Sequence, residues 1–358
     1  MNMQTFLKIL RWLVGLLFIF SGLIKANDPL GLSYKMQEFF DVWGMSFLSD
    51  YTLGLAYCMN LLEIITGIAL LIKFPYKQTL WLLLGLILFF TFLTGYALFS
   101  GKIKTCGCFG DCLVLTPKIS FIKDILLLIS ILLLLITHKK VKTNFSKSLG
   151  IFILLISTIG VGYGQYYVLQ NLPFIDCLPY KVGNDINEQM KTPNGAIADS
   201  IVIEMDFIKN GVHYSFTPDK FPTDFDSTYV FNTRKEVVVK KGNGIKAPIA
   251  DFNLNTLQGR DTTAALFATP TPYVLIFAGQ IDPTIPWEKL LQTIHNKHKL
   301  VYIVTADKSG AISSLAKENI LIADITMIKT AARVWPTIFI MNGATIMQKK
   351  SFLFYTEK

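Results

Sequence analysis

Three of the chain's five cysteines lie within the seven-residue stretch CGCFGDC at 106–112. Clustered thiols can ligate a metal, form a structural disulfide or exchange disulfides with another protein. Zinc sites need about four ligands and typically separate their cysteines by about two to four residues. Cys106 and Cys108 are separated by one residue, and no histidine lies nearby. We therefore expect no metal site, and a structural staple and an exchangeable disulfide remain as alternatives.

The spacing of the loop cysteines favours exchange. A disulfide between Cys106 and Cys108 would close a small, strained ring, and strained disulfides are reduced more easily. Cys112 lies a few residues further on and could act as the resolving thiol. The odd number of loop cysteines leaves one thiol to pair elsewhere, with Cys177 as the obvious partner. We predict that Cys106, Cys108 and Cys112 are catalytic and that Cys177 is their redox partner.

The segments that must position these cysteines are apolar enough to lie in a membrane. The chain is 52% apolar, which is high for a soluble protein. Five runs approach the roughly 17–25 apolar residues that a membrane-spanning helix needs. They lie near 6–25, 51–72, 79–99, 120–137 and 149–169. The cysteine cluster falls between the third run and the fourth.

Basic residues predict the orientation of these spans, because loops rich in Lys and Arg stay in the cytoplasm. Residues 1–170 carry 14 Lys/Arg and 7 Asp/Glu, hence seven of the nine net positive charges. This distribution indicates membrane topology rather than a nucleic-acid surface. The residues that set the orientation are Lys8, Arg11, Lys73, Lys77, His138, Lys139, Lys140, Lys142 and Lys147. They predict a cytoplasmic N-terminus, with 26–50, 100–119 and everything after about residue 170 on the extracytoplasmic side.

The cysteine cluster is therefore expected on the oxidising side of the membrane, together with Cys177. Lys102 and Lys104 lie just before the cluster. Nearby cations lower the pKa of a thiol and favour the nucleophilic thiolate. We predict that these two lysines activate the loop cysteines.

Glu63 is the outstanding residue inside a predicted span. An ionisable side chain in a bilayer is costly and is a functional candidate. Asn60 lies one turn earlier, and Cys58 lies further out on the same helix. We predict a site at these three residues that relays protons or orients a quinone headgroup; the alternative is an internal hydrogen bond or ion pair without chemistry. Lys123 and Asp124 are expected to mark the outer end of the fourth span.

Residues 171–245 are expected to form a linker and a small β-rich segment. The stretch LPFIDCLPYKVGNDI is punctuated by Pro and Gly, which is typical of a linker. The predicted strands IVIEMDFI and VHYSFT flank Lys209-Asn210-Gly211, a turn sequence typical of a β-hairpin. STYVFNT and KEVVVKK are two further predicted strands.

From residue 246 onward, predicted strands and helices alternate. The strands are YVLIF, LVYIVTA and the hairpin pair TIFIM and TIMQKK, which turns about Asn342-Gly343. The helices are an amphipathic segment at 286–297 that Pro286 opens, followed by 309–319 and 324–334.

This order of elements resembles thioredoxin-like domains of the TlpA and peroxiredoxin type. The segment IKAPIADFNLNTLQG and the turn Val334-Trp335-Pro336-Thr337 carry the resemblance. It implies that Pro336, after Trp335, is the cis-proline of that fold. In thioredoxins a Cys-x-x-Cys pair follows the strand equivalent to YVLIF, but AGQIDP at 278–283 contains no cysteine. Without a thiolate this domain cannot exchange disulfides itself, so we expect a binding platform or lid.

The membrane half resembles the DoxX/MauE family of bacterial membrane proteins. The resembling segments are FSGLIKANDPLGLSYKMQEFF, LLEIITGIALL and CGCFGDCLVLTPKISFIKD. The motif CGCFG before a membrane span is the most specific of them. The whole chain resembles the Bacteroidota branch of the family, in which this module is fused to an extra span and a periplasmic thioredoxin-like domain.

The expected fold is a multi-pass α-helical membrane bundle followed by an extracytoplasmic β segment and an α/β thioredoxin-like domain without Cys-x-x-Cys. Its parts are a four-helix membrane domain at 1–140, a fifth membrane helix at 141–170, the linker and β-rich segment at 171–245 and the thioredoxin-like domain at 246–358. The resemblance implies a bacterial inner membrane with a periplasmic C-terminal domain.

Two functions remain open. The first is a redox-associated protein that supports thiol–disulfide exchange of exported proteins and passes electrons to a quinone. DsbB and vitamin K epoxide reductase share such a plan, by analogy of architecture only. The second is a non-catalytic scaffold whose tail docks partners of an export or maturation complex. The expected partners are membrane lipid and exported proteins with thiols, or a periplasmic redox or export partner, and no nucleic acid.

Overall fold

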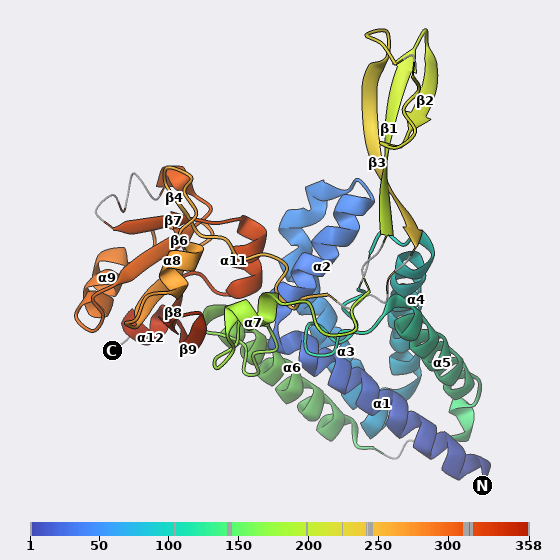
Figure 1. Ribbon diagram of the computed structural model, residues 1–358. Helices are drawn as coiled ribbons and strands as arrows, with labels where there is room; N and C mark the ends of the chain where they lie inside the picture. The colour runs from blue at the N-terminus through green and yellow to red at the C-terminus, as the bar shows by residue number, and fades with distance from the viewer. Residues whose placement is uncertain are drawn as a thin grey trace. The chain divides into compact units, whose positions relative to one another are not determined.

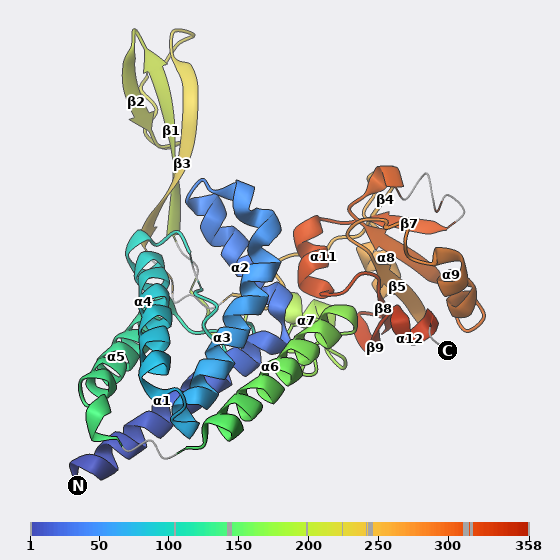
Figure 2. The same cartoon turned by 180° about the vertical axis from the view of Figure 1, so that it is seen from behind.

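The computed structural model describes residues 2–103, 105–141, 145–197, 200–223, 225–240, 242, 246–310, 315 and 318–356 (Figures 1 and 2). The chain forms two compact units. The first comprises Met1–Gly183 with Leu254–Lys358, and the second comprises Asn184–Asn253. Lys104, Lys142 and most of the predicted helix at 309–319 lie outside the described residues.

Within the described residues, five helical segments are long and apolar enough to cross a membrane. They are α1 (Met3–Asn27), η1 with α3 (Ser46–Tyr51 and Thr52–Ile72), α4 (Tyr76–Ser100), α5 (Pro117–Ile136) and α6 (Lys147–Gln170). A short helix η2 (His138–Lys140) follows α5. The five predicted spans are confirmed, and their ends differ from the prediction by a few residues because polar and glycine residues extend each helix beyond its apolar run.

An additional helix, α2 (Pro29–Val42), lies between the first two spans and was not predicted. Asp28 caps it by accepting a hydrogen bond from the Gly31 amide at 3.0 Å, and Pro29 occupies its first turn. Both residues are typical start signals of a helix. Phe39 of α2 is 3% exposed and packs with Cys106. This helix therefore covers the cysteine loop.

The close approach of α1 and α3 holds the bundle together. A Cβ atom added at Gly22 would lie 2.5 Å from Ile64 Cγ1, and one added at Gly67 would lie 2.8 Å from the Gly15 carbonyl oxygen. The absence of a side chain lets the two backbones touch, as is common between membrane helices. Helix α3 also contacts α4 and α6, while α5 packs on α4 and α1.

The second unit contains the short helix α7 (Ile186–Met190) and a three-stranded antiparallel sheet of order β2-β1-β3. Its strands are β1 (Ser200–Lys209), β2 (Val212–Phe216) and β3 (Val230–Lys240). Asn210 and Gly211 both have positive φ and form the predicted hairpin turn. Two predicted strands are in fact the single strand β3, which pairs with β1 along nearly its whole length.

In the first unit, residues Leu254–Thr356, here called the C-terminal domain, contain a six-stranded sheet of order β4-β7-β6-β5-β8-β9. Its strands are β4 (Asn255–Thr256), β5 (Tyr273–Phe277), β6 (Val301–Thr305), β7 (Asn319–Ile322), β8 (Thr337–Asn342) and β9 (Thr345–Ser351). Its helices are α8 (Thr263–Phe267), α9 (Trp287–His295), α11 (Ile325–Ala331) and α12 (Leu353–Thr356). Strands β7, β6 and β5 are parallel, and β8 and β9 continue the sheet antiparallel.

The predicted strands β5, β6, β8 and β9 are present, and β7 was missed. All of β5 is buried, and its alternate residues Val274 and Ile276 pack against Leu290 and Ile294 of α9. The peptide bond between Trp335 and Pro336 is cis. The sheet-rich C-terminal region thus has its own apolar core.

Candidate functional site

The cysteine loop connects α4 to α5, and glycines determine its course. Gly101 ends α4 with a φ of 65°, and Gly107 and Gly110 have φ values of 66° and 55°. This left-handed region favours glycine over other residues. The Gly110 amide donates to the Gly107 carbonyl at 3.0 Å. Cys106 therefore lies just before a sharp turn, and Cys108 lies inside it.

The two cysteines of that turn are free thiols in shielded positions. Cys106 is 8% exposed and packs with Phe39, Ala97 and Ile103. The carbonyl of Cys108 accepts a hydrogen bond from the Ser21 hydroxyl of α1 at 3.0 Å. The loop is thus packed against α1, α2 and α4.

Burial, rather than nearby lysines, dominates the pKa of these thiols. Burial raises the pKa of Cys106 to about 12, with a further contribution from Cys108, and the cation Lys35 offsets it only in part. Burial also raises the pKa of Cys108, against an opposing effect of Lys123. The predicted lowering of thiol pKa by Lys102 and Lys104 is therefore wrong in direction for these two cysteines. Lys102 is exposed, and Lys104 lies outside the described residues.

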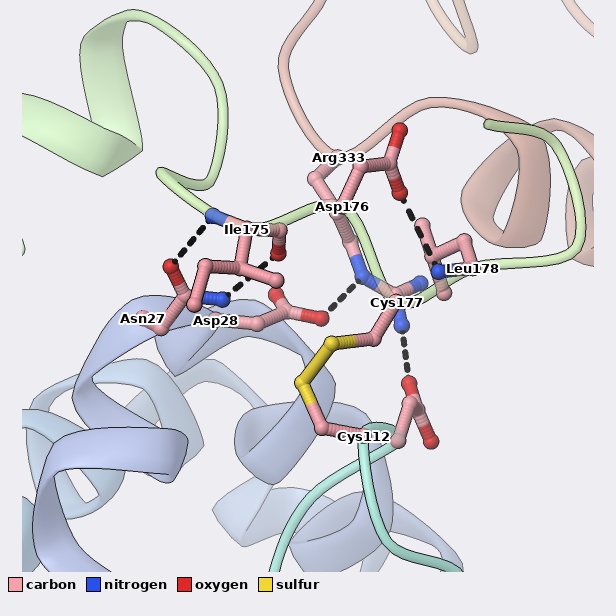
Figure 3. Close-up of a disulfide and its surroundings, with 9 residues drawn as sticks. Asn27, Asp28, Cys112, Ile175, Asp176, Cys177, Leu178 and Arg333 are labelled. Atoms are coloured by element: carbon pink, nitrogen blue, oxygen red, sulfur yellow. Dashed lines mark hydrogen bonds and ion pairs between the residues drawn. A yellow bond between two sulfur atoms is a disulfide. The ribbon is translucent and has the colours of Figure 1, made fainter. Parts of the chain in front are cut away.

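Cys112 forms a disulfide with Cys177, at a Cα–Cα separation of 4.8 Å (Figure 3). This is the partner that the odd number of loop cysteines favoured. The bond joins the cysteine loop to the segment after α6. Ile175 lies in the same segment and binds Asn27 at the end of α1. The Asn27 amide donates to the Ile175 carbonyl at 2.8 Å, and the Asn27 side-chain oxygen accepts from the Ile175 amide at 3.0 Å.

Two ion pairs lie inside the bundle below the cysteine turn. Lys25 of α1 pairs with Glu63 of α3, and the two side chains are 2% and 1% exposed. Lys123 pairs with Asp124 of α5 at 2.5 Å, and Thr94 donates to the same carboxylate at 3.0 Å. Asp124 is fully buried among the helices, about two turns from the start of α5. That it marks the outer end of its span stays a prediction.

Two small cavities lie next to these groups and the thiols. One, of about 20 Å³, is lined by Glu63, Lys123 and Asp124 together with apolar side chains. The other, of about 30 Å³, is lined by Lys25, Cys106 and Cys108, among others.

Phe90 lines both cavities, so they adjoin. Each has room for about one or two water molecules.

The other two residues of the predicted intramembrane site are not part of this cluster. Asn60 is buried, but its amide donates to Gln165 Oε1 of α6 at 3.0 Å. Gln165 in turn donates to the Tyr57 carbonyl at 3.3 Å. Asn60 therefore attaches α6 to α3, and Cys58 is exposed. Five positions separate Cys58 from Glu63, and this spacing places them on different faces of a helix.

The predicted turn residues of the C-terminal domain lie beside the end of β5. The Trp335 ring is so close to Gly279 that a Cβ atom there would lie 2.4 Å from it. Trp335 donates its indole N–H to the Ala332 carbonyl at 3.1 Å. The loop after β5 and the turn before Pro336 thus pack together, and neither contributes a thiol.

Sequence reasoning missed three cations, namely Lys25, Arg333 and Lys349. Lys25 has a local signal, because a lysine in the last turn of a predicted span is unusual enough to suggest a partner. Arg333 and Lys349 have no such signal. Arg333 pairs with Asp28 and Asp111, and Lys349 pairs with Asp176. Among the described residues there is no cluster of three or more potential metal ligands.

Comparison with known proteins finds a similarity over the first four candidate spans. Residues 3–137 match a family model described as methylamine utilisation protein MauE. This range covers α1 to α5, so this part of the chain is a MauE-like membrane protein. Residues 203–241 match a second family model, described as a domain of unknown function, DUF8463. No curated protein matches the chain, and no solved structure matches it.

Proposed function

We propose that this MauE-like membrane protein supports the maturation of exported proteins by thiol–disulfide exchange at the extracytoplasmic face of the bacterial inner membrane. The observation that carries the proposal is the arrangement of four cysteines. Two free thiols, Cys106 and Cys108, lie in the same short loop as one half of the Cys112–Cys177 disulfide. One dithiol and one disulfide in a single loop are the components that a two-electron relay requires.

In this relay, a client thiolate attacks the Cys112–Cys177 disulfide, of which Cys112 is exposed. One sulfur forms a mixed disulfide with the client and the other leaves as a thiolate; the second client thiol then completes its own disulfide. The released Cys112 and Cys177 thiols next reduce a disulfide between Cys106 and Cys108, which yields the two free thiols of the structure. Two electrons and two protons move in each step.

The buried ion pairs supply a route for the protons. Lys25 and both inner thiols line one cavity, and the Glu63 carboxylate that Lys25 binds lines the adjoining one. A thiol whose pKa is raised gives up its proton only to a well-placed acceptor. In the proposal the Glu63 carboxylate is that acceptor, and the Lys25 ammonium passes a proton to Glu63 as it takes one from the thiol. A lipid-soluble quinone outside the two cavities is the proposed final electron acceptor.

The C-terminal domain is proposed to be thioredoxin-like. Supporting this, its central strands β7, β6 and β5 are parallel and its β8–β9 hairpin continues the sheet from β5. It would act as a non-catalytic docking module, since 278–283 contain no cysteine. We also propose that this domain is periplasmic, which reporter fusions ending at residues 140 and 356 test: equal sidedness of the two would contradict it.

Thiol trapping in membranes tests the exchange function. Membranes from cells with and without quinone synthesis are treated with an alkylating reagent, and the labelled fraction of Cys106 and Cys108 is measured. We expect quinone depletion to increase that fraction, because the pair cannot be reoxidised. Cys58→Ser serves as the matched control, since Cys58 lies outside the loop. An unchanged fraction, with no mixed disulfide trapped by Cys108→Ser or Cys177→Ser, contradicts the proposal.

The second candidate function is a scaffold whose disulfide is a permanent staple. The raised pKa of Cys106 favours it, since a buried protonated thiol is inert. The same trapping experiment distinguishes the two, because with a permanent staple the labelled fraction of Cys106 and Cys108 is the same in both membranes.

A further inference from the structure

An aspartate precedes each half of the disulfide, and each aspartate binds a cation of the C-terminal domain. Asp111 precedes Cys112 and accepts from Arg333 Nη2 at 2.5 Å. Asp176 precedes Cys177 and accepts from Lys349 Nζ at 2.7 Å. The bundle and the C-terminal domain belong to the same compact unit. Each half of the disulfide is therefore preceded by an Asp–cation contact. Figure 3 shows Arg333 beside the disulfide.

Arg333 is placed to hold several groups at once. It lies just after α11 and is 7% exposed. Its Nε donates to Asp28 at 2.7 Å and its Nη1 donates to the Lys329 carbonyl at 2.6 Å. The ring of Tyr34 in α2 lies 5.5 Å from its guanidinium carbon, a distance typical of a cation–π contact. One side chain thus joins the start of α2 to the cysteine loop.

Lys349 of β9 likewise holds several groups of the segment that carries Cys177. Its side chain is 3% exposed, and its ammonium also donates to the Tyr180 carbonyl at 3.3 Å. Nearby, the Gly183 amide donates to the Ile346 carbonyl of the same strand at 2.8 Å. The segment that carries Cys177 is therefore attached to β9 by its backbone as well as by Asp176.

Removing one member of a buried ion pair leaves an uncompensated charge and is strongly unfavourable. Lys349 therefore favours the docked position while Asp176 is in place. Arg333 favours it through two carboxylates, Asp111 and Asp28. The disulfide keeps these same two Asp-Cys dipeptides together.

We propose that the C-terminal domain is a clamp on the Cys112–Cys177 disulfide, with Arg333 and Lys349 as its positioning residues. The segments that it binds are this chain's own Asp111-Cys112 and Asp176-Cys177. Docking of the domain holds the two cysteines together, and the closed disulfide presents both aspartates to the domain. The two events are linked, so each favours the other by the same factor.

The test measures how easily the disulfide is reduced in the full-length protein in detergent. The background carries Cys58→Ser, Cys106→Ser and Cys108→Ser, so that Cys112 and Cys177 are the chain's remaining cysteines. This background cannot perform the proposed exchange, and the result is therefore independent of that function. The protein is equilibrated in mixtures of reduced and oxidised dithiothreitol, and the reduced fraction is determined by alkylation and mass spectrometry.

We expect Arg333→Met and Lys349→Met each to raise the ratio of reduced to oxidised protein about tenfold, which is about 30 mV for this couple. Arg260→Met is the matched control, because Arg260 is an exposed arginine of the same domain, and it should change nothing. A shift of less than twofold in both clamp variants, or an equal shift in the control, overturns the proposal.

Two further measurements guard against a folding defect. Asp111→Asn alters a side chain that is 47% exposed and should by itself raise the reduced fraction. Combined with Arg333→Met, it should raise the reduced fraction little further, because both substitutions remove the same Arg333–Asp111 contact. Additive effects contradict the clamp. Reduction of the parent protein should also lower the hydrogen-exchange protection of α11, and unchanged protection contradicts the linkage.

Discussion

The Lys25–Glu63 pair permits a quantitative test of what a buried charge does in this bundle. Lys25→Met leaves the Glu63 carboxylate without its cation, and Glu63→Gln leaves the Lys25 ammonium without its anion. Because both side chains are at most 2% exposed, bulk solvent cannot replace the missing partner. Breaking a buried pair from one side costs about 3–5 kcal/mol. Each single variant should lose about that much of its free energy of unfolding.

The double variant Lys25→Met/Glu63→Gln removes both charges and should recover most of this loss. Replacing a whole buried ion pair by uncharged groups is often neutral. The coupling free energy of the cycle should therefore be at least about 2 kcal/mol. Unfolding of the detergent-solubilised protein is followed at increasing temperature or denaturant concentration. Lys8→Met, on an exposed position of the same helix, is the control and should be neutral.

The refuting result is clear in this design. The charges are not paired in a water-excluded site if each single variant loses less than about 1 kcal/mol of its free energy of unfolding. The same holds if the loss in the double variant equals the sum of the two single losses. The double variant also separates structure from chemistry. If it is stable but its Cys106 and Cys108 no longer cycle in membranes, the pair moves protons; if they still cycle, the pair is structural.

Two further predictions concern the loop and the helix contact. Burial raises the pKa of Cys106 to about 12 from an ordinary 9.0. Cys106 should therefore react with iodoacetamide at pH 8 roughly a thousandfold more slowly than a free thiol. Its rate should rise tenfold per pH unit up to about pH 12, and a rate that levels off near pH 9 would contradict this. Gly67→Ala, whose new methyl would lie 2.8 Å from the Gly15 carbonyl oxygen, should destabilise the bundle by about 1–3 kcal/mol. Gly85→Ala meets nothing within 4 Å and should be neutral or slightly stabilising, so equal effects of the two would refute the packing argument.

Local patterns determined much of the fold. The five spans follow from runs of apolar residues, since a bilayer demands long helices whose backbone groups bond internally. The hairpin turn at Asn210-Gly211 follows from two residues that tolerate positive φ. The buried strand β5 follows from the apolar run YVLIF. These features depend on neighbours in the sequence. Strand β7 was missed for the same reason, because its four residues lack a local pattern strong enough to distinguish a strand.

Only the tertiary structure decided which side chains meet. Glu63 is recognisable in the sequence as an expensive charge, but its partner Lys25 lies 38 residues away on another helix. Asn60 and Cys58 share a helix with Glu63, yet one faces α6 and the other is exposed. Helical rotation separates them, and the sequence alone does not show which face is turned inward.

The same limit applies to the cysteine loop. Its sequence identifies the thiols and the glycine turn, whereas burial by α2 reverses the expected direction of their pKa shifts. The contact between Arg333 and Asp111 joins residues 222 positions apart. Desolvation and long-range charge pairing depend on how the whole chain packs, so a local sequence pattern predicts neither of them.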